Sequence, residues 1–412
     1  MPLEFPGGRR WFYNQPMDIS LISLRNALSK EKAKEVDATS AVFLSAINPS
    51  GHYHFYRDEF RENAPFLFFI ESGGSEAPFI KIYQNYPAPY YLLTKGDSNS
   101  LASALEILSF LHQSGLEGKI LYGSPKEIEA EIAQISWLYD ARRKFSNAKL
   151  GVIGKPSNWL IASSVDYALA ENRFGLHFVD ISMDELKAEI DKRSYPKEHL
   201  PKDLEGKAPS KEVLEGALWI YGALKRLVEK YQLQGFTIRC FDLLGIYKNT
   251  SCLALALLNS EGVSAGCEGD EASLISMHLL RSLGEPAFQC NPSSVSIKDN
   301  TMVLAHCTLP LMMAKNGYSL LTHYESDLGI GVRGVFVPGK VTILKIANNL
   351  VDFHLSSGEI VENLTEGCLC RSQIRVHFDN PVAPYLDNPY GNHLLLAYGN
   401  HVEQISQLLS SY

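Results

Sequence analysis

The chain of 412 residues has no long hydrophobic run, no excess of basic residues and few cysteines, and each shortage excludes a class of protein. Its longest apolar stretches, 65–70 and 252–258, fall far short of the roughly 20 residues that a membrane-spanning helix needs. The 38 lysines and arginines stand against 46 aspartates and glutamates, so the net charge of −8 disfavours a nucleic-acid partner. Seven cysteines, an odd and widely spaced set, do not form the pattern of a disulfide framework.

Several sequence motifs are also missing. The first 16 residues contain no apolar core of a signal peptide. The segment 151–154 reads Gly-Val-Ile-Gly and lacks the spacing of a dinucleotide-binding loop, and the chain has neither a Walker A loop nor a G-x-S-x-G elbow. These absences disfavour an NTPase and a serine hydrolase. We therefore expect a cytoplasmic protein that binds a small molecule, without a membrane or nucleic-acid partner.

The composition that remains is that of a large globular protein. With 45% hydrophobic and 20% charged residues, the chain has enough apolar sequence for a sizeable core. At about 150 residues per domain, its length predicts two or three domains. The pattern of elements predicts the α/β class, with two Rossmann-like α/β units over 1–148 and 149–286. A C-terminal antiparallel β-barrel-like domain is expected over 287–412.

Local patterns predict the individual elements. Apolar or aromatic runs between Gly, Pro and Asn residues predict strands in the first unit, at 41–47, 65–70, 79–83 and 90–94. Leucines at helical spacing predict a helix over 101–114, and the capping box 124–127 begins another that reaches about residue 144. In the second unit we expect strands at 151–154, 176–179 and 235–241 and helices at 183–192 and 214–231. After residue 286 the strands predicted are 303–307, 331–336, 341–346, 375–378 and 393–398.

The sharpest local feature is the segment Gly266-Cys267-Glu268-Gly269-Asp270, where a strand of small residues meets a predicted helix. Side chains two positions apart on a strand point the same way, so Glu268 and Asp270 are placed to converge at the carboxyl end of the strand. That edge is where open α/β sheets bind ligands. The alternative is structural, because Asp is a preferred N-cap residue and Asp270 directly precedes the helix.

Histidines form a second set of candidates. His306, His323 and Glu325 lie on neighbouring predicted strands and suit a divalent ion or a polyol, although each histidine alone also fits a hydrogen-bonded structural role. His393 stands at the entry to an apolar strand. Cys368-x-Cys370 has no matching cysteine pair, which disfavours structural zinc.

Three groups of segments, which share their order along the chain with the family, resemble the L-fucose isomerase-like superfamily, which includes the L-arabinose isomerases. The stretch 249–274 is similar to a region of L-fucose isomerases that contains Thr-Glu-Asn-Asp-Ser-Leu. His393-Leu-Leu-Leu-Ala-Tyr-Gly399 is similar to their His-Gly-Val-Leu-Thr-Tyr-Gly. The segments 154–164, 305–310 and 323–326 are closer to the shorter fucose isomerase-related proteins.

The resemblance implies a metal-dependent aldose–ketose isomerase that acts on a free pentose, hexose or deoxyhexose through an enediolate. Asp270 and His393 are then ligands of a divalent metal, Mn²⁺ or else Mg²⁺, and Glu268 is a third ligand or the proton shuttle. Catalytic roles are expected for Glu268 and Asp270. The residues expected to contact the sugar are His306, His323, Glu325, Trp159 and Asn158, with core packing as the alternative for Trp159. The resemblance also implies a homo-oligomer, a trimer or a hexamer.

One departure from the family opens alternatives. True L-fucose isomerases have a catalytic, metal-binding Glu about two dozen residues before the Asp that matches Asp270, whereas this chain has Ser251 and Cys252 there. Either Glu268 replaces that acid, or His306, His323 or Glu325 completes the site, or the activity is altered or lost. The alternatives are a catalytically silent or regulatory sugar-binding relative, and another metal-dependent carbohydrate reaction such as epimerisation.

Overall fold

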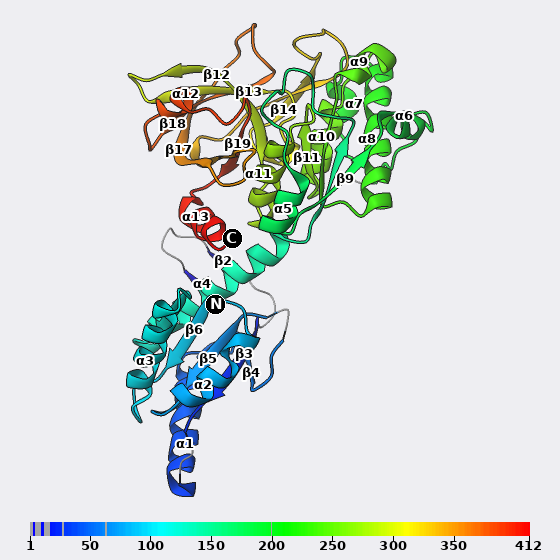
Figure 1. The fold of residues 1–412 in the computed structure, drawn as a ribbon. Coiled ribbons are helices and arrows are strands. Elements are labelled where there is room, and N and C mark those ends of the chain that lie inside the picture. Colours follow the sequence, from blue (N-terminus) through cyan, green and yellow to red (C-terminus); the bar gives the residue numbers. More distant parts are fainter. Residues whose placement is uncertain (1–2, 5–9, 12–16, 27–28, 62–63, 199) are drawn as a thin grey trace. The chain divides into compact units, whose positions relative to one another are not determined.

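The computed structural model describes residues 3–4, 10–11, 17–26, 29–61, 64–198 and 200–412 (Figure 1). Most of the segment 1–16, in which we expect no signal peptide, lies outside these residues. The chain divides into two compact units, Met1–Asp140 and Ala141–Tyr412. Among the described residues, no helix is both long enough and apolar enough to cross a membrane.

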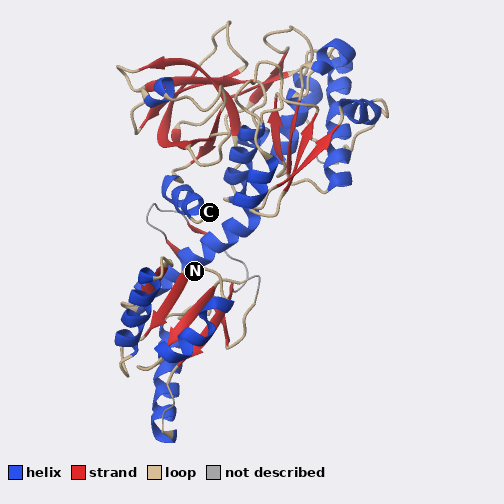
Figure 2. Cartoon of the chain, in the orientation of Figure 1, coloured by secondary structure: helices blue, strands red, loops and turns tan. Residues whose placement is uncertain are grey.

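The first unit contains a five-stranded sheet in which every neighbouring pair is parallel, in the order β4-β3-β5-β6-β7 (Figure 2). Its central strand β5 reads Phe-Leu-Phe-Phe-Ile and is buried on both faces, as a parallel strand between helices requires. The strands are β3 (Met17–Leu24), β4 (Tyr53–Arg57), β5 (Phe66–Ile70), β6 (Tyr90–Thr94) and β7 (Gly118–Leu121). A separate antiparallel pair is formed by β1 (Leu3–Glu4) and β2 (Arg10–Trp11).

The helices of this unit confirm two predictions and correct two others. The helices expected at 101–114 and from residue 125 are present as α3 (Ser100–Gln113) and α4 (Pro125–Phe145). The strand expected at 41–47 is wrong, because Ser29 caps a helix, α1 (Lys30–Ala46), that continues through those residues. The strand expected at 79–83 is also wrong. Phe79 and Tyr83 are stacked at a ring distance of 5.3 Å along α2 (Glu76–Ile82) and the 3₁₀ turn η1 (Tyr83–Asn85), so their spacing is helical.

The second unit begins with a four-stranded parallel sheet in the order β11-β10-β8-β9. Its strands are β8 (Lys149–Ile153), β9 (His177–Ile181), β10 (Gly235–Ile238) and β11 (Ser264–Cys267). The helix α8 (Lys211–Tyr231) begins at Ser210, whose hydroxyl accepts from the Val213 amide, and buries an apolar face. The other helices are α5 (Tyr167–Phe174), α6 (Met183–Ile190), α7 (Leu204–Lys207), α9 (Asp242–Tyr247), α10 (Cys252–Ser260) and α11 (Glu271–Ser282).

The rest of the second unit is built on a closed antiparallel barrel, as the sequence predicted in coarse form. The strand order around it is β12-β13-β18-β17-β16-β19, with β19 pairing back to β12. The strands are β12 (Phe288–Ser296), β13 (Thr301–His306), β16 (Gly339–Ile346), β17 (Phe353–Asn363), β18 (Ser372–Phe378) and β19 (Leu394–Tyr398). Outside the barrel lie the hairpin β14 (Tyr318–Leu321) and β15 (Gly331–Gly334), the turn η2 (Leu311–Met313), and the helices α12 (Pro384–Asp387) and α13 (Val402–Ser410).

The sequence placed a domain border near residue 286, and this border falls inside the second unit. One continuous hydrophobic core includes residues on both sides of it, such as Phe236 in the parallel sheet and Phe288 and Ile343 in the barrel. Side chains that share a core hold the sheet and the barrel together as one packed body. The site described next uses strands from both parts.

Candidate metal centre

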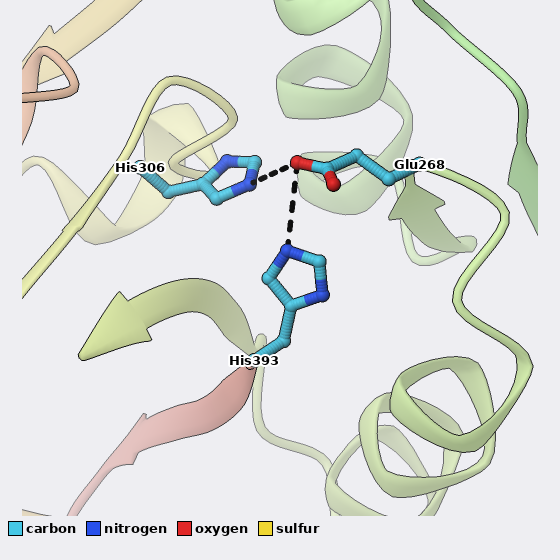
Figure 3. A group of neighbouring side chains, drawn as sticks. All are labelled: Glu268, His306 and His393. Carbon is cyan, nitrogen blue, oxygen red and sulfur yellow. Dashed lines mark ion pairs between the residues drawn. The ribbon is translucent and has the colours of Figure 1, made fainter. Parts of the chain in front are cut away.

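Three side chains that are far apart in sequence meet where the parallel sheet faces the barrel. Glu268 directly follows β11, His306 ends β13, and His393 directly precedes β19. One ligand atom from each lies within 4.8 Å of the others, and all three residues are buried. Glu268 Oε1 is 3.8 Å from His306 Nε2 and 3.5 Å from His393 Nε2, and Figure 3 shows both rings directed at that carboxylate.

The backbone after β11 is shaped to present Glu268. Both Glu268 and Gly269 have left-handed backbone angles, with φ of 64° and 76°. A Cβ on Gly269 would lie 2.7 Å from the Lys155 carbonyl oxygen, so only glycine fits there without a shift. The Ser157 amide donates to the Glu268 carbonyl at 2.9 Å, and the Trp159 indole donates to Oε2 at 2.7 Å. Oε2 is thereby held, and Oε1 faces the two histidines.

The histidines are oriented through their other ring nitrogens. His393 Nδ1 lies 2.8 Å from Asp270 Oδ2, and His306 Nδ1 lies 2.9 Å from the Thr308 hydroxyl. His393 Nε2 is buried and has no hydrogen-bond partner among the described residues. An imidazole that is fixed by a carboxylate at one nitrogen and free at the other has the usual arrangement of a metal ligand.

Asp270 caps a helix, which is one of the two roles left open by the sequence, and it also contacts His393. Its carboxylate caps α11 by accepting from the Ser273 amide at 2.7 Å. The Ser273 hydroxyl donates to Oδ2 at 2.7 Å, and the ammonium of Lys345 lies 3.3 Å from the same oxygen. Asp270 is outside the three-residue group, and its oxygens are occupied by these contacts. The structure therefore supports a positioning role, and its role as a metal ligand stays a prediction.

Lys345 is the member of this network that sequence reasoning missed. It lies on β16 with its side chain fully buried, and its ammonium donates to the Ser273 hydroxyl at 2.8 Å as well as to Asp270. In sequence it is one of two lysines in β16, which reads Gly-Lys-Val-Thr-Ile-Leu-Lys-Ile, and nothing in that pattern separates it from a solvent-facing lysine. The burial of Lys345 marks it as part of the site, and this burial follows from closure of the barrel, which the sequence pattern does not show.

The acidic and basic groups of the site each favour the charged form of the other. Burial opposes ionisation of Glu268, but the nearby rings of His306 and His393 favour the charged carboxylate, outweigh burial and hold the pKa of this carboxyl well below its usual range. Burial likewise opposes ionisation of Asp270, and Lys345 and His393 lower the pKa of that carboxyl. Burial disfavours the charged form of His393, yet Asp270 and Glu268 raise its pKa to about 9. Both acids are therefore carboxylates at neutral pH.

The cavity beside Glu268 has a volume of about 30 Å³, which is room for an ion and one or two water molecules. His306, His323 and Glu325 line it with Glu268, as the sequence predicted for a common pocket. Burial lowers the pKa of His323, so its ring is neutral at pH 7.

Trp159 contacts two residues that line this cavity. It is 51% exposed, donates to Glu268, and packs edge-to-face on Phe241, which lines the cavity, at a ring distance of 4.9 Å. Asn158, also predicted to contact the sugar, is exposed and accepts a hydrogen bond from Arg239. The described lining of the cavity does not include Asn158.

The resemblance to L-fucose isomerases aligns Ser251 and Cys252 with a catalytic acid, and Cys252 carries a thiol. Cys252 lines the cavity, and burial raises the pKa of this thiol, which keeps it protonated at neutral pH. A protonated thiol is neither a hard oxygen ligand nor a proton acceptor. Glu325 is the carboxylate, besides Glu268, among the described residues that line this cavity.

Comparison with protein families and curated protein sequences returned no relative. No protein-family model matches the chain, and no curated protein sequence matches it. The function is therefore argued from the chemistry of the site.

Proposed function

We propose that this protein is a metal-dependent aldose–ketose isomerase in which Glu268, His306 and His393 hold the metal ion. The observation that carries the proposal is the buried Nε2 of His393, which has no hydrogen-bond partner among the described residues and faces a carboxylate and a second imidazole. Leaving such an atom unsatisfied costs about 1–3 kcal/mol. A bound cation would relieve that cost.

The donor set fits a divalent cation. One carboxylate oxygen and two imidazole nitrogens suit first-row divalent metals, and the carboxylate favours Mn²⁺ or Mg²⁺ more than a thiolate-binding metal. We propose Mn²⁺, with Mg²⁺ as the alternative. Asp270 fixes the ring of His393, and Thr308 fixes that of His306, so both nitrogens are set before an ion arrives.

The reaction needs a base near a polarised carbonyl. A bound divalent ion supplies Lewis-acid stabilisation of the negative charge that develops on the two adjacent sugar oxygens. Glu325 takes the proton from one carbon and returns it to the next, because it is the second carboxylate of the cavity. The neutral ring of His323 hydrogen-bonds a sugar hydroxyl.

The cavity is too small for a whole monosaccharide, which we place at its opening. Only the reacting end of the open-chain sugar enters, and the half-exposed ring of Trp159 packs on the rest. The substrate proposed is a free pentose, hexose or deoxyhexose. We propose further that both α/β parts are Rossmann-like, and that the protein is a cytoplasmic homo-oligomer, either trimeric or hexameric.

A second candidate function is a sugar-binding or regulatory protein without turnover. It is favoured by Cys252, which puts a protonated thiol where the true isomerases have an acid. Epimerisation on the same metal site is the third reading, since it also begins with removal of a proton beside a carbonyl.

The test is a panel of free aldoses incubated with the Mn²⁺-loaded protein and assayed for ketose formation. We expect turnover of at least one sugar, and loss of that turnover in Glu268→Gln. Glu362→Gln is the matched control, because Glu362 pairs with Arg375 outside the site and should leave activity unchanged. Binding of a sugar without turnover would establish the second candidate instead, and a C-epimer as product would establish the third.

A further inference from the structure

A second cleft opens at the same edge of the parallel sheet, separate from the metal centre. The sheet order β11-β10-β8-β9 means that the chain leaves β8 toward one side and, after β9, returns to build β10 and β11 on the other. The space outside the carboxyl ends of β8 and β10 is therefore a topological switch point, where open α/β sheets bind ligands. A cleft of about 810 Å³ lies there, within the usual range of about 300–1,000 Å³ for small-molecule sites.

A glycine in the lining of the cleft lets neighbouring loops approach one another closely. Gly154 follows β8 directly and has a φ of 82°, which favours glycine. A Cβ at this position would lie 2.9 Å from the Cβ of Arg239 and 3.1 Å from the side chain of Met183. The close approach of the loops after three strands leaves the cleft between them.

One wall of the cleft is rich in hydrogen-bond acceptors. The hydroxyl of Tyr167 lies 2.9 Å from Asp180 Oδ1 and 3.2 Å from Glu271 Oε1. Its single proton can serve only one of these carboxylates at a time. The other oxygen of Glu271 accepts from the Val165 amide, and no hydrogen bond reaches the second oxygen of Asp180 from the described residues. Because these two carboxylates share one tyrosine proton and one oxygen of Asp180 accepts no hydrogen bond from the described residues, they are suited to accept from two hydroxyls of a ligand.

The lining of the cleft also carries positive charge. The ammonium of Lys155 is exposed on the cleft and has no ion-pair partner in the described part of the chain. The guanidinium of Arg239 is fixed by the carbonyl of Pro156 at 2.8 Å, by Asn158 and by Asp242, so its charge stays in the wall. A free ammonium and a fixed guanidinium in the lining of one cleft suit a phosphate group.

We propose that this cleft binds a phosphorylated sugar, with its hydroxyls on Asp180 and Glu271 and its phosphate on Lys155 and Arg239. Because the lining holds both carboxylates and cations, neither half of such a ligand satisfies it. A neutral sugar leaves the ammonium unpaired, and inorganic phosphate leaves the carboxylates without donors. This ligand differs from the free sugar proposed for the metal centre, and the two sites share no lining residue.

The test is isothermal titration calorimetry of the full-length chain, with EDTA present so that no metal competes for the probe. The probes are ribose 5-phosphate, ribose and inorganic phosphate. We expect one molecule of ribose 5-phosphate per chain, with an affinity at least about tenfold higher than for either of the other two. Lys155→Ala and Asp180→Asn should each weaken it about tenfold, the value of one charge-assisted hydrogen bond.

Two controls make the outcome decisive. Asp184→Asn changes an exposed carboxylate of α6 that pairs with Lys187 outside the cleft, and it should bind like the wild type. Glu268→Gln removes a proposed metal ligand and should also leave binding unchanged. The proposal is overturned if ribose 5-phosphate does not bind, binds no better than phosphate, or binds Lys155→Ala and Asp180→Asn as tightly as the wild type. Loss of binding in Glu268→Gln would put the probe in the metal cavity and overturn it as well. Turnover plays no part in this readout, so failure of the isomerase proposal is seen separately.

Discussion

Two buried glutamates directly follow strands of parallel sheets, and their partners make them different. Glu71 follows β5 in the first unit and is paired with Arg57 and, at 3.8 Å, with Arg25. Glu268 follows β11 in the second unit and faces two imidazoles. Burial raises the pKa of Glu71 despite its arginines, whereas the histidines lower that of Glu268. Permanent cations neutralise a carboxylate, while imidazoles can give up their protons to a metal.

The largest expected effect separates these two glutamates. Glu268→Gln and His393→Ala should each reduce Mn²⁺ affinity by about 100-fold or more, because each removes a ligand. Glu71→Gln should leave the affinity unchanged, because it lies in a different unit. Equilibrium dialysis against Mn²⁺ measures all three. Equal losses in Glu71→Gln and Glu268→Gln would erase the distinction drawn between the two sites.

The buried ion pair behind His393 should carry the next largest effect. Lys345→Met leaves Asp270 buried without its cation, and we expect the free energy of unfolding to fall by about 3 kcal/mol. Chemical denaturation followed by circular dichroism measures the change. Lys340→Met, which removes an exposed ammonium from the same strand, should cost about 0.5 kcal/mol or less. A loss in Lys345→Met as small as in this control would mean that Asp270 does not depend on the lysine.

Two buried histidines, His278 on α11 and His393 before β19, differ in the same way, because carboxylates flank His393, whereas burial dominates at His278. His393 lies between two carboxylates and has a pKa of about 9, whereas burial lowers the pKa of His278 from 6.5 to about 4. His278 is thus neutral in the folded protein, and its stabilising contribution is present above pH 6.5 and is lost as the pH falls from 6.5 toward 4. From pH 7 to pH 5 this loss amounts to about 2 kcal/mol.

The variant His278→Leu isolates this pH dependence. Its free energy of unfolding should fall less than that of the wild type between pH 7 and pH 5, by the same 2 kcal/mol. Urea denaturation at the two pH values gives the difference. Parallel losses in both proteins would show that other groups dominate the acid sensitivity.

The smallest expected effect concerns the ring of His306. Thr308→Val removes the hydroxyl that fixes its Nδ1 while keeping the side-chain volume, and Mn²⁺ affinity should fall about tenfold. The same dialysis measures it. Thr342→Val, whose hydroxyl bonds Gly399 instead, is the matched control. An unchanged affinity in Thr308→Val would indicate that the barrel alone orients His306.

Much of the fold could be predicted where local signals agree. The run 65–70 is apolar throughout and forms β5, and the capping box at 124–127 begins α4. The runs 41–47 and 79–83 are apolar too, but both are helical. Ser29 caps the helix that contains the first run, and Phe79 and Tyr83 stack across the second. Neither contact is visible when a short apolar run is considered by itself. Strand order in the sheets and closure of the barrel depend on pairings between distant segments, which one sequence does not encode locally.

The sequence was enough to predict which residues form the candidate site, but not what each of them does there. Glu268, His306 and His393 were all named from sequence, and the structure brings them within ligand distance of one another. Asp270 could not be assigned, since a carboxylate before a helix looks the same whether it caps, binds metal or holds a histidine. Lys345 and Thr308 are ordinary strand and loop residues until their contacts are seen.

The central claim is that two imidazoles and one carboxylate bind a divalent ion, and pulsed EPR of the Mn²⁺-loaded protein tests it most directly. Nitrogen nuclei bound to the ion couple to its unpaired electrons. We predict couplings from two distinct imidazole nitrogens, of which one disappears in His306→Ala. Mn²⁺ spectra without any nitrogen coupling would contradict the account.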